Sequence, residues 1–315
     1  MIDLKAFNRT LWLAEPRSLL RYAATLSRIS LCPSAREVAA FNKERLEEAR
    51  SVASRAVRAK KGKVGVIPVM GPVEQRMSGR LMKLGGTSTE EVGVALDALL
   101  SDDTVGSIVL DIDSPGGSSY GVEELSDKIY AARGKKPIHA IADSMAASAG
   151  YWIASAASSL SVTPGGDVGS VGVYALHVDE SKALEAEGLK VTGVHAGKYK
   201  LEGASWEPLS AESLAHFQSE VDHTYSKFVK ALARNRGVAQ AKVKDDFGQG
   251  RLLNPEQAKA AGMVDHVQTL EQLLGTLMGG TDSAHRRASV EVLQKRQEQV
   301  RRRQRIGWRV EAVPA

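Results

Sequence analysis

The stretch DSMAASAGYW, residues 143–152, places Ser148 among small residues at the expected start of a helix. Small residues let another backbone approach closely, and the free N–H groups of a helix N-terminus favour developing negative charge. A serine hydroxyl in this setting could act as a nucleophile toward a carbonyl. A lone serine is more often a helix cap or a surface hydroxyl, so Ser148 needs support from other residues.

The stretch DIDSPGGSS, residues 111–119, follows an apolar strand and precedes a helix. Open α/β sheets bind ligands at this end of their strands. Pro115 fixes its own φ, whereas Gly116 and Gly117 allow close approach, so their N–H groups can point into a cleft. A tight connection that simply requires glycine explains the turn equally well.

A serine nucleophile needs a base, and none of the seven histidines stands in a Ser-His-Asp motif. Lys198 and Lys200, in VHAGKYKLEG, follow an expected strand and could enter the same cleft. A lysine base must be neutral, and lowering its pKa from about 10.4 by about three units takes roughly 4 kcal/mol of desolvation. Ser170, in DVGSVGV, is a candidate for holding the amine, although a turn serine between glycines is an equal explanation.

The elements that must position these residues alternate between strand and helix, which predicts right-handed βαβ crossovers and a mainly parallel sheet. A long helix and a final strand-helix-strand unit follow, with Asn254 and Gly262 bounding the last helix. The expected strands are 64–69, 106–112, 137–142, 160–164, 170–176 and 190–196, and the expected helices are 88–100, 120–134, 148–157, 179–188 and 211–236.

Three regions are expected along the chain. Residues 1–63 have helix-forming composition and are expected to be an N-terminal helical extension, and residues 64–270 are expected to form the α/β domain. Residues 271–315 are expected to be a basic tail, helical or mobile. From Ser283 onward the tail holds nine Lys and Arg against three Glu, a net charge of +6, while the whole chain carries +5. Nucleic-acid binding is therefore not expected beyond a possible contact by the tail.

Composition limits the class of protein. With 315 residues and 43% hydrophobic content the chain can bury a core. The single cysteine, Cys32, cannot form an internal disulfide, and without a Cys/His cluster we expect no metal and no cofactor. No apolar run reaches the length of a membrane span, and charged residues interrupt the N-terminus, so we expect neither span nor signal peptide and a cytoplasmic location.

Four motifs, DIDSPGG, SMAASAGYW, GSVGV and GKYK, occur in this order, followed by GRLLNPEQAKAAGMVDHV. Together they resemble the SppA/protease IV family of serine peptidases over residues 64–268. The resemblance implies a ClpP/crotonase-like fold of repeated ββα and βαβ units and a Ser-Lys dyad. It implies Ser148 as the nucleophile and Lys200 as the general base, with Ser170 supporting the base. The N–H groups of Gly117 and Ala149 would form the oxyanion hole.

Within the family, the N-terminal extension and KYKLEGASWEPL resemble the lambda protein C-like head maturation proteases of tailed phages. Their substrates would be scaffold, portal or capsid proteins inside a procapsid. The short basic tail departs from relatives that continue into a scaffold-like region. The resemblance also implies a homo-oligomer in which a neighbouring subunit completes the cleft, and an extended substrate paired with strand edges near SPGG.

Three alternatives remain. A cytoplasmic SppA-like protease would degrade peptides, a crotonase-like acyl-CoA enzyme would not need Ser148, and a non-enzymatic assembly factor would bind shell proteins through its tail and N-terminal helices.

Overall fold

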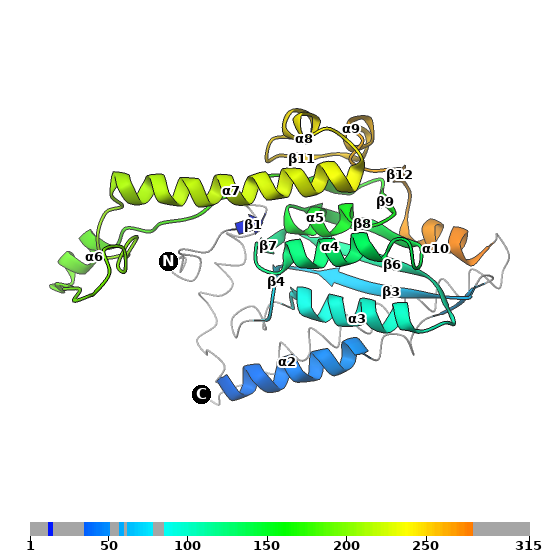
Figure 1. Cartoon of the computed structure of the whole chain (residues 1–315), viewed down its shortest axis with the longest axis horizontal. Helices are drawn as coiled ribbons and strands as arrows, with labels where there is room; N and C mark the ends of the chain where they lie inside the picture. Colours follow the sequence, from blue (N-terminus) through cyan, green and yellow to red (C-terminus); the bar gives the residue numbers. More distant parts are fainter. Residues whose placement is uncertain (1–11, 15–34, 51–56, 60–61, 78–84, 280–315) are drawn as a thin grey trace, which may run out of the picture.

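The computed structural model describes residues 12–14, 35–50, 57–59, 62–77 and 85–279 (Figure 1). Its larger sheet is mostly parallel, as predicted, and helices cover both faces. The strand order is β11-β10-β8-β6-β3-β2, with β9 beside the first half of β8 and β12 beside β9. The strands are β2 (Val57–Ala59), β3 (Gly62–Met70), β6 (Val105–Ser114), β8 (Ile138–Ala147), β9 (Ser159–Val162), β10 (Asp167–Gly169), β11 (Leu252–Leu253) and β12 (His266–Val267).

The central strands are apolar because both of their faces are buried, as is usual in parallel sheets. Alternate residues face opposite sides. Ile108, Leu110 and Ile112 of β6 join the larger core, while Val109 packs in a smaller core on the other face with Ile141 of β8. A continuous apolar run therefore supplies two cores at once.

Helices α3, α4, α5 and α7 contribute to the larger core, and α10 contributes to the smaller one. Figure 1 shows α4 and α5 between α3 and the long α7, with α2 outside α3. The helices are α2 (Ala35–Arg50), α3 (Thr89–Ser101), α4 (Val122–Ala132), α5 (Ala149–Ser155), α6 (Ser181–Ala186), α7 (Ala211–Arg236), α8 (Gln240–Asp246), α9 (Pro255–Ala261) and α10 (Leu270–Met278).

Helix boundaries follow local signals in the sequence. Ser88 caps α3 by accepting a hydrogen bond from the N–H of Glu91. Asn254 and Gln257 form a capping box at α9, with Pro255 in its first turn, and Gly262 ends the helix in the left-handed conformation. These helix boundaries confirm the predictions made from the same residues.

A small second sheet lies at the carboxyl end of β6. Its order is β1-β7-β4-β5, and only β1 is antiparallel to its neighbour. Its strands are β1 (Trp12–Ala14), β4 (Val73–Glu74), β5 (Thr87–Ser88) and β7 (Gly116–Ser118). No sequence pattern predicts this sheet, because its strands have two or three residues each.

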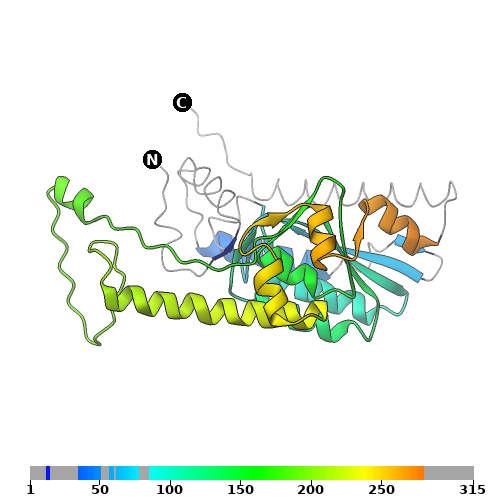
Figure 2. The same ribbon diagram turned by 90° about the horizontal axis from the view of Figure 1, so that it is seen from above.

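Two expected strands do not form. Residues 170–176 contain only an isolated bridge, and residues 190–196 are irregular and exposed. We call residues 172–209 the arm. Figures 1 and 2 show the arm, with α6 in it, projecting from the sheet beyond the N-terminal end of α7. A strand needs a hydrogen-bonding partner, and the described residues offer none at this distance from the sheet.

The expected outer regions differ in part from the structure. The described part of the N-terminal region contains the helix α2 and the strands β1 and β2. Helix α10 falls within the region assigned to the tail, yet it packs on the sheet. The basic residues from 280 onward lie outside the described residues. Among those described, no helix combines the length and apolar character needed to cross a membrane.

Candidate active site

Strands β6 and β8 bring their carboxyl ends to one edge of the sheet. Ser114, the last residue of β6, is paired with Ala146 near the end of β8. Ser148 directly follows β8 and is the N-cap of α5. Helix α5 in turn contacts β7, the strand that follows the Ser-Pro-Gly turn. The two sequence motifs therefore meet at this edge.

Ser148 has an unusual backbone and an unusual side-chain environment. Its φ of 52° and ψ of −114° are strained for a residue with a Cβ. The residue is fully buried, and its Oγ has no hydrogen-bond partner among the described residues. Such a sharp strand-to-helix turn is the arrangement that holds a nucleophilic serine in several hydrolases. A buried hydroxyl without a partner is costly and so indicates function rather than capping.

The first turn of α5 lies close to the end of β6. A Cβ on Gly150 would lie 3.2 Å from both the Cβ and the carbonyl oxygen of Ser114, so glycine permits the approach. The carbonyl of Ser148 accepts the N–H of Trp152 at 2.9 Å, which is the first bond of the helix. The N–H of Ala149, three residues before Trp152, is one of the first-turn amides that have no acceptor inside the helix.

Packing makes Gly117 irreplaceable in its turn. A Cβ there would lie 1.9 Å from the carbonyl oxygen of Val73, because β7 is paired with β4 on one side. The Ser114 hydroxyl donates to the carbonyl of Gly71 at 2.7 Å and accepts the N–H of Gly116 at 3.1 Å. Gly117 thus allows β7 to lie close to β4, and it would equally allow the backbone of a ligand to approach.

Ser170 lies beside Ser148. Strand β10 is parallel to β8, and Gly169 is paired with Ala147, so each serine follows a paired residue. Ser170 is buried, has a φ of 53°, and donates its N–H to the carbonyl of Arg251 at 2.8 Å. Two neighbouring strands are therefore each followed directly by a serine with positive φ.

Lys200 does not join this group in the single chain. All residues from 185 to 200 are exposed, Lys200 among them, whereas Ser148 is buried. The backbone N–H of Lys200 donates to the carbonyl of Gly197 in a local turn of the arm. The structure therefore brings Ser148, Ala149, Gly117 and Ser170 to one edge of the sheet and leaves Lys200 on the arm.

Lys198, the second lysine of the motif, is occupied by an ion pair. Its Nζ lies 2.8 Å from Glu212 Oε1 and 2.8 Å from the Tyr199 hydroxyl. The hydrogen bonds that Lys198 donates to Glu212 and Tyr199 raise the pKa of Lys198 above its ordinary value. A base must lose its proton, so Lys198 is the poorer candidate of the two.

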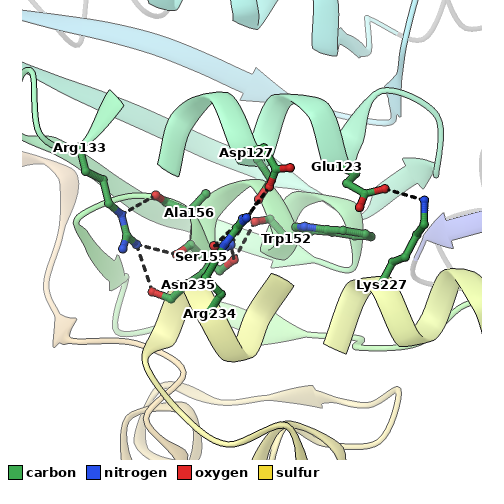
Figure 3. Close-up of polar contacts among 10 residues, drawn as sticks. Glu123, Asp127, Arg133, Trp152, Ser155, Ala156, Lys227, Arg234 and Asn235 are labelled. Atoms are coloured by element: carbon green, nitrogen blue, oxygen red, sulfur yellow. Dashed lines mark hydrogen bonds and ion pairs between the residues drawn. The ribbon is translucent and has the colours of Figure 1, made fainter. Parts of the chain in front are cut away.

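A polar network fixes the far end of α5 (Figure 3). The Arg133 guanidinium donates to the carbonyls of Ser155, Ala156 and Ala157, which would otherwise lack partners at the helix C-terminus. It also donates to the carbonyl of Asn235 on α7 at 3.1 Å. The Asn235 amide donates to the Ser155 hydroxyl at 2.9 Å.

Aromatic packing holds the same helix from the other sides. Trp152 stacks on Phe228 of α7, with ring centroids 4.6 Å apart and planes at 9°. The Tyr151 hydroxyl donates to the carbonyl of Met263 at 2.9 Å. Both aromatic side chains are buried in the core, and together with Arg133 these contacts leave α5 little freedom to shift Ser148.

Sequence reasoning missed two parts of this region. Nothing in the order of residues links Arg133 to the end of α5, because the link depends on how α4 packs. Nor did it foresee that β1, from the N-terminal extension, pairs with β7, because a three-residue strand carries no periodic signal.

Comparison with known proteins finds a family model that matches the region around this site. Residues 131–282 match the model of Peptidase family S49. Over 176 residues the chain is 32% identical to the head-tail preconnector protein GP5 of Enterobacteria phage P21, covering 56% of this chain and 35% of that protein. Over 226 residues it is 29% identical to the capsid assembly protease C of Escherichia phage lambda, covering 72% and 51%.

A cellular relative is also similar. Over 172 residues the chain is 26% identical to Protease 4 of Haemophilus influenzae, covering 54% of this chain and 28% of that protein. The chain thus spans about half or less of the length of each of these three relatives. The matched family region includes Ser148, Ser170 and Lys200.

Proposed function

We propose that the chain is a serine endopeptidase that cleaves phage scaffold, portal or capsid proteins, because residues 131–282 match the model of Peptidase family S49. The observation that carries this proposal is Ser148, a buried hydroxyl without a partner, held at a strained strand-to-helix turn. The proposed fold is of the ClpP/crotonase type, in agreement with the parallel sheet and with the turn after β6 beside the nucleophile.

The proposed reaction is acyl transfer to water. Neutral Lys200 removes the proton of Ser148 Oγ, which bonds to the substrate carbonyl carbon while the carbonyl oxygen becomes an oxyanion. The N–H groups of Gly117 and Ala149 stabilise that oxyanion, and losing one such donor typically costs on the order of 10²–10³ in rate. Lys200 then protonates the leaving amine, and water cleaves the acyl-enzyme in the same way.

Lys200 is proposed to reach Ser148 from a neighbouring copy of the chain. The arm exposes the apolar side chains of Leu189, Val191 and Val194, the last of them 96% exposed. Exposed apolar residues on a projecting segment favour burial against a partner. Docking there would also remove water from Lys200, as a neutral lysine requires, and Ser170 beside Ser148 is proposed to hold the amine.

The phage substrates are proposed from the relatives named as capsid assembly protease and head-tail preconnector. A second candidate is peptide degradation of the kind expected of an SppA-type protease, because Protease 4 and a putative signal peptide peptidase SppA are also relatives. The substrate separates the two. Cleavage of phage capsid and scaffold proteins at few sites supports the first, and cleavage of casein alone supports the second.

The dyad is tested by the variants Ser148→Ala and Lys200→Ala, each expected to lose on the order of 10⁴-fold or more in cleavage rate. Lys198→Ala is the matched control and is expected to stay within a few-fold of the parent. Mixing inactive Ser148→Ala chains with inactive Lys200→Ala chains is expected to restore part of the activity, because one mixed interface then holds both residues. Full activity in either single variant would refute the dyad, and no recovery on mixing would refute the shared site.

A further inference from the structure

The strand β1 pairs with β7 at the edge of the candidate active site. The partners are Trp12 with Ser118, Leu13 with Gly117 and Ala14 with Gly116, in antiparallel orientation. Strand β1 is the outermost strand of the small sheet, and β4 lies on the other side of β7. A segment about a hundred positions earlier in the sequence therefore covers the free edge of β7.

That edge is the natural place for an extended peptide to bind. Proteins often bind a peptide by adding it as a strand to an exposed sheet edge, with backbone hydrogen bonds as the main contact. Strand β7 directly follows the Ser114 turn and contacts α5, whose N-cap is Ser148. With β4 on its other side, β7 has this one edge to offer among the described residues.

The register sets the direction in which β1 lies along the site. Because the strands are antiparallel, Ala14 is opposite Gly116, next to the turn, and Trp12 is opposite Ser118, farther along β7. The carboxyl end of β1 thus points toward the end of β6, which is paired with the end of β8 just before Ser148. Ser148 Oγ is itself inaccessible in the same structure.

We propose that β1 is an internal peptide ligand of the active site, which occupies the strand position of the substrate and must leave before an extended apolar peptide can bind. The proposal rests on the proposed function for the identity of the site, but not on Ser148 being the nucleophile. Strand β1 belongs to the same chain, so its occupancy lowers the apparent affinity for substrate by the fraction of molecules in which the edge is free.

The test is peptide binding to the full-length Ser148→Ala chain, so that no cleavage is needed. The probe is a fluorescein-labelled synthetic peptide with residues 8–17 of this chain, NRTLWLAEPR. Leu13→Pro in the chain removes a backbone N–H and disfavours the strand pairing, whereas Leu13→Ala keeps the backbone and is the matched control. Leu13→Pro is expected to bind the probe on the order of tenfold more tightly than either the parent or Leu13→Ala.

A reversible lock provides the second arm. Trp12→Cys and Ser118→Cys, introduced with Cys32→Ser, join two directly paired positions by a disulfide. The oxidised chain is expected to lose probe binding, and reduction is expected to restore it. Equal affinity in the oxidised and reduced chains, equal affinity in Leu13→Pro and Leu13→Ala, or failure of the disulfide to form would overturn the proposal. The dyad would fail separately, through active Ser148→Ala or Lys200→Ala variants, with these binding results unchanged.

Discussion

The backbone N–H of Ser148 donates a 2.7 Å hydrogen bond to the carbonyl oxygen of Gly169, the residue before Ser170. This bond joins the ends of β8 and β10 at the point where both strands turn sharply. It fixes the strained backbone of Ser148 to a position that favours glycine, since Gly169 has a φ of 125°. The position of the hydroxyl thus depends on a glycine outside its own segment.

Gly169→Ala is therefore expected to impair the site. An added Cβ would lie 2.7 Å from the carbonyl oxygen of Arg251, and the backbone angle is one that alanine rarely adopts. We expect a loss of about 1–3 kcal/mol in the free energy of unfolding, measured by urea denaturation, together with slower cleavage. Gly165→Ala, where nothing lies within 4 Å, is the control. Equal effects of the two substitutions would contradict this account.

Gly117→Ala is expected to abolish cleavage while Gly134→Ala does not. At position 117 the Cβ would collide with the backbone of Val73, so β7 must separate from β4. At position 134 nothing lies within 4 Å. The measurement is the cleavage rate beside the circular dichroism spectrum of each variant. A folded, fully active Gly117→Ala chain would show that the close pairing of β7 and β4 is not needed.

Arg133→Ala is expected to loosen α5 from its C-terminal end. The substitution leaves the carbonyls of Ser155, Ala156, Ala157 and Asn235 without this donor, and a carbonyl that loses its donor and stays dry costs about 1–3 kcal/mol. We expect the free energy of unfolding to fall by about 2–4 kcal/mol in urea denaturation. Arg133→Lys should recover only part of it, because an ammonium cannot reach all four carbonyls. Full recovery of the free energy of unfolding by lysine would show that the branched guanidinium of Arg133 is not needed.

Acid should weaken the contact between the end of α7 and the loop before β12. Burial opposes ionisation of Asp265, but hydrogen bonds from Arg236 and from the N–H of Leu160 outweigh it, so the pKa of Asp265 lies below its ordinary value. A lowered folded pKa stabilises the protein above the ordinary carboxyl pKa, and this contribution is lost as the pH falls through the folded value. Asp265→Asn should flatten the pH dependence of unfolding below about pH 4. An unchanged slope would contradict this assignment.

Local chemistry made much of the fold predictable. The Ser88 cap, the bounds of α7 and the Asn254 and Gly262 ends of α9 all depend on neighbouring residues in the chain. The central strands were also predictable, because their apolar runs are long. The signal that singled out Ser148, small residues between a strand and a helix, is local in the same way.

The parts of the fold and of the candidate site that were not predicted depend on contacts between segments distant in the sequence. Residues 190–196 are an expected strand, but a strand also needs a partner, and this segment pairs with no strand within the described part of the chain. The pairing of β1 with β7 joins residues about a hundred positions apart in the sequence. So does the hydrogen bond between Arg133 and Asn235, which lies on α7. The placement of Lys200 away from Ser148 has the same origin, because the arm extends beyond the packed domain.

The most direct measurement of the central claim is the site of covalent labelling by a fluorophosphonate, located by mass spectrometry in the full-length chain. The reagent forms a bond from a serine Oγ to phosphorus with loss of fluoride, and it needs an activated serine. We expect a single adduct on the peptide that contains Ser148, much slower to form in Lys200→Ala and unchanged in Lys198→Ala. Labelling at another serine, or labelling of Ser148 at the same rate without Lys200, would contradict the Ser148–Lys200 dyad.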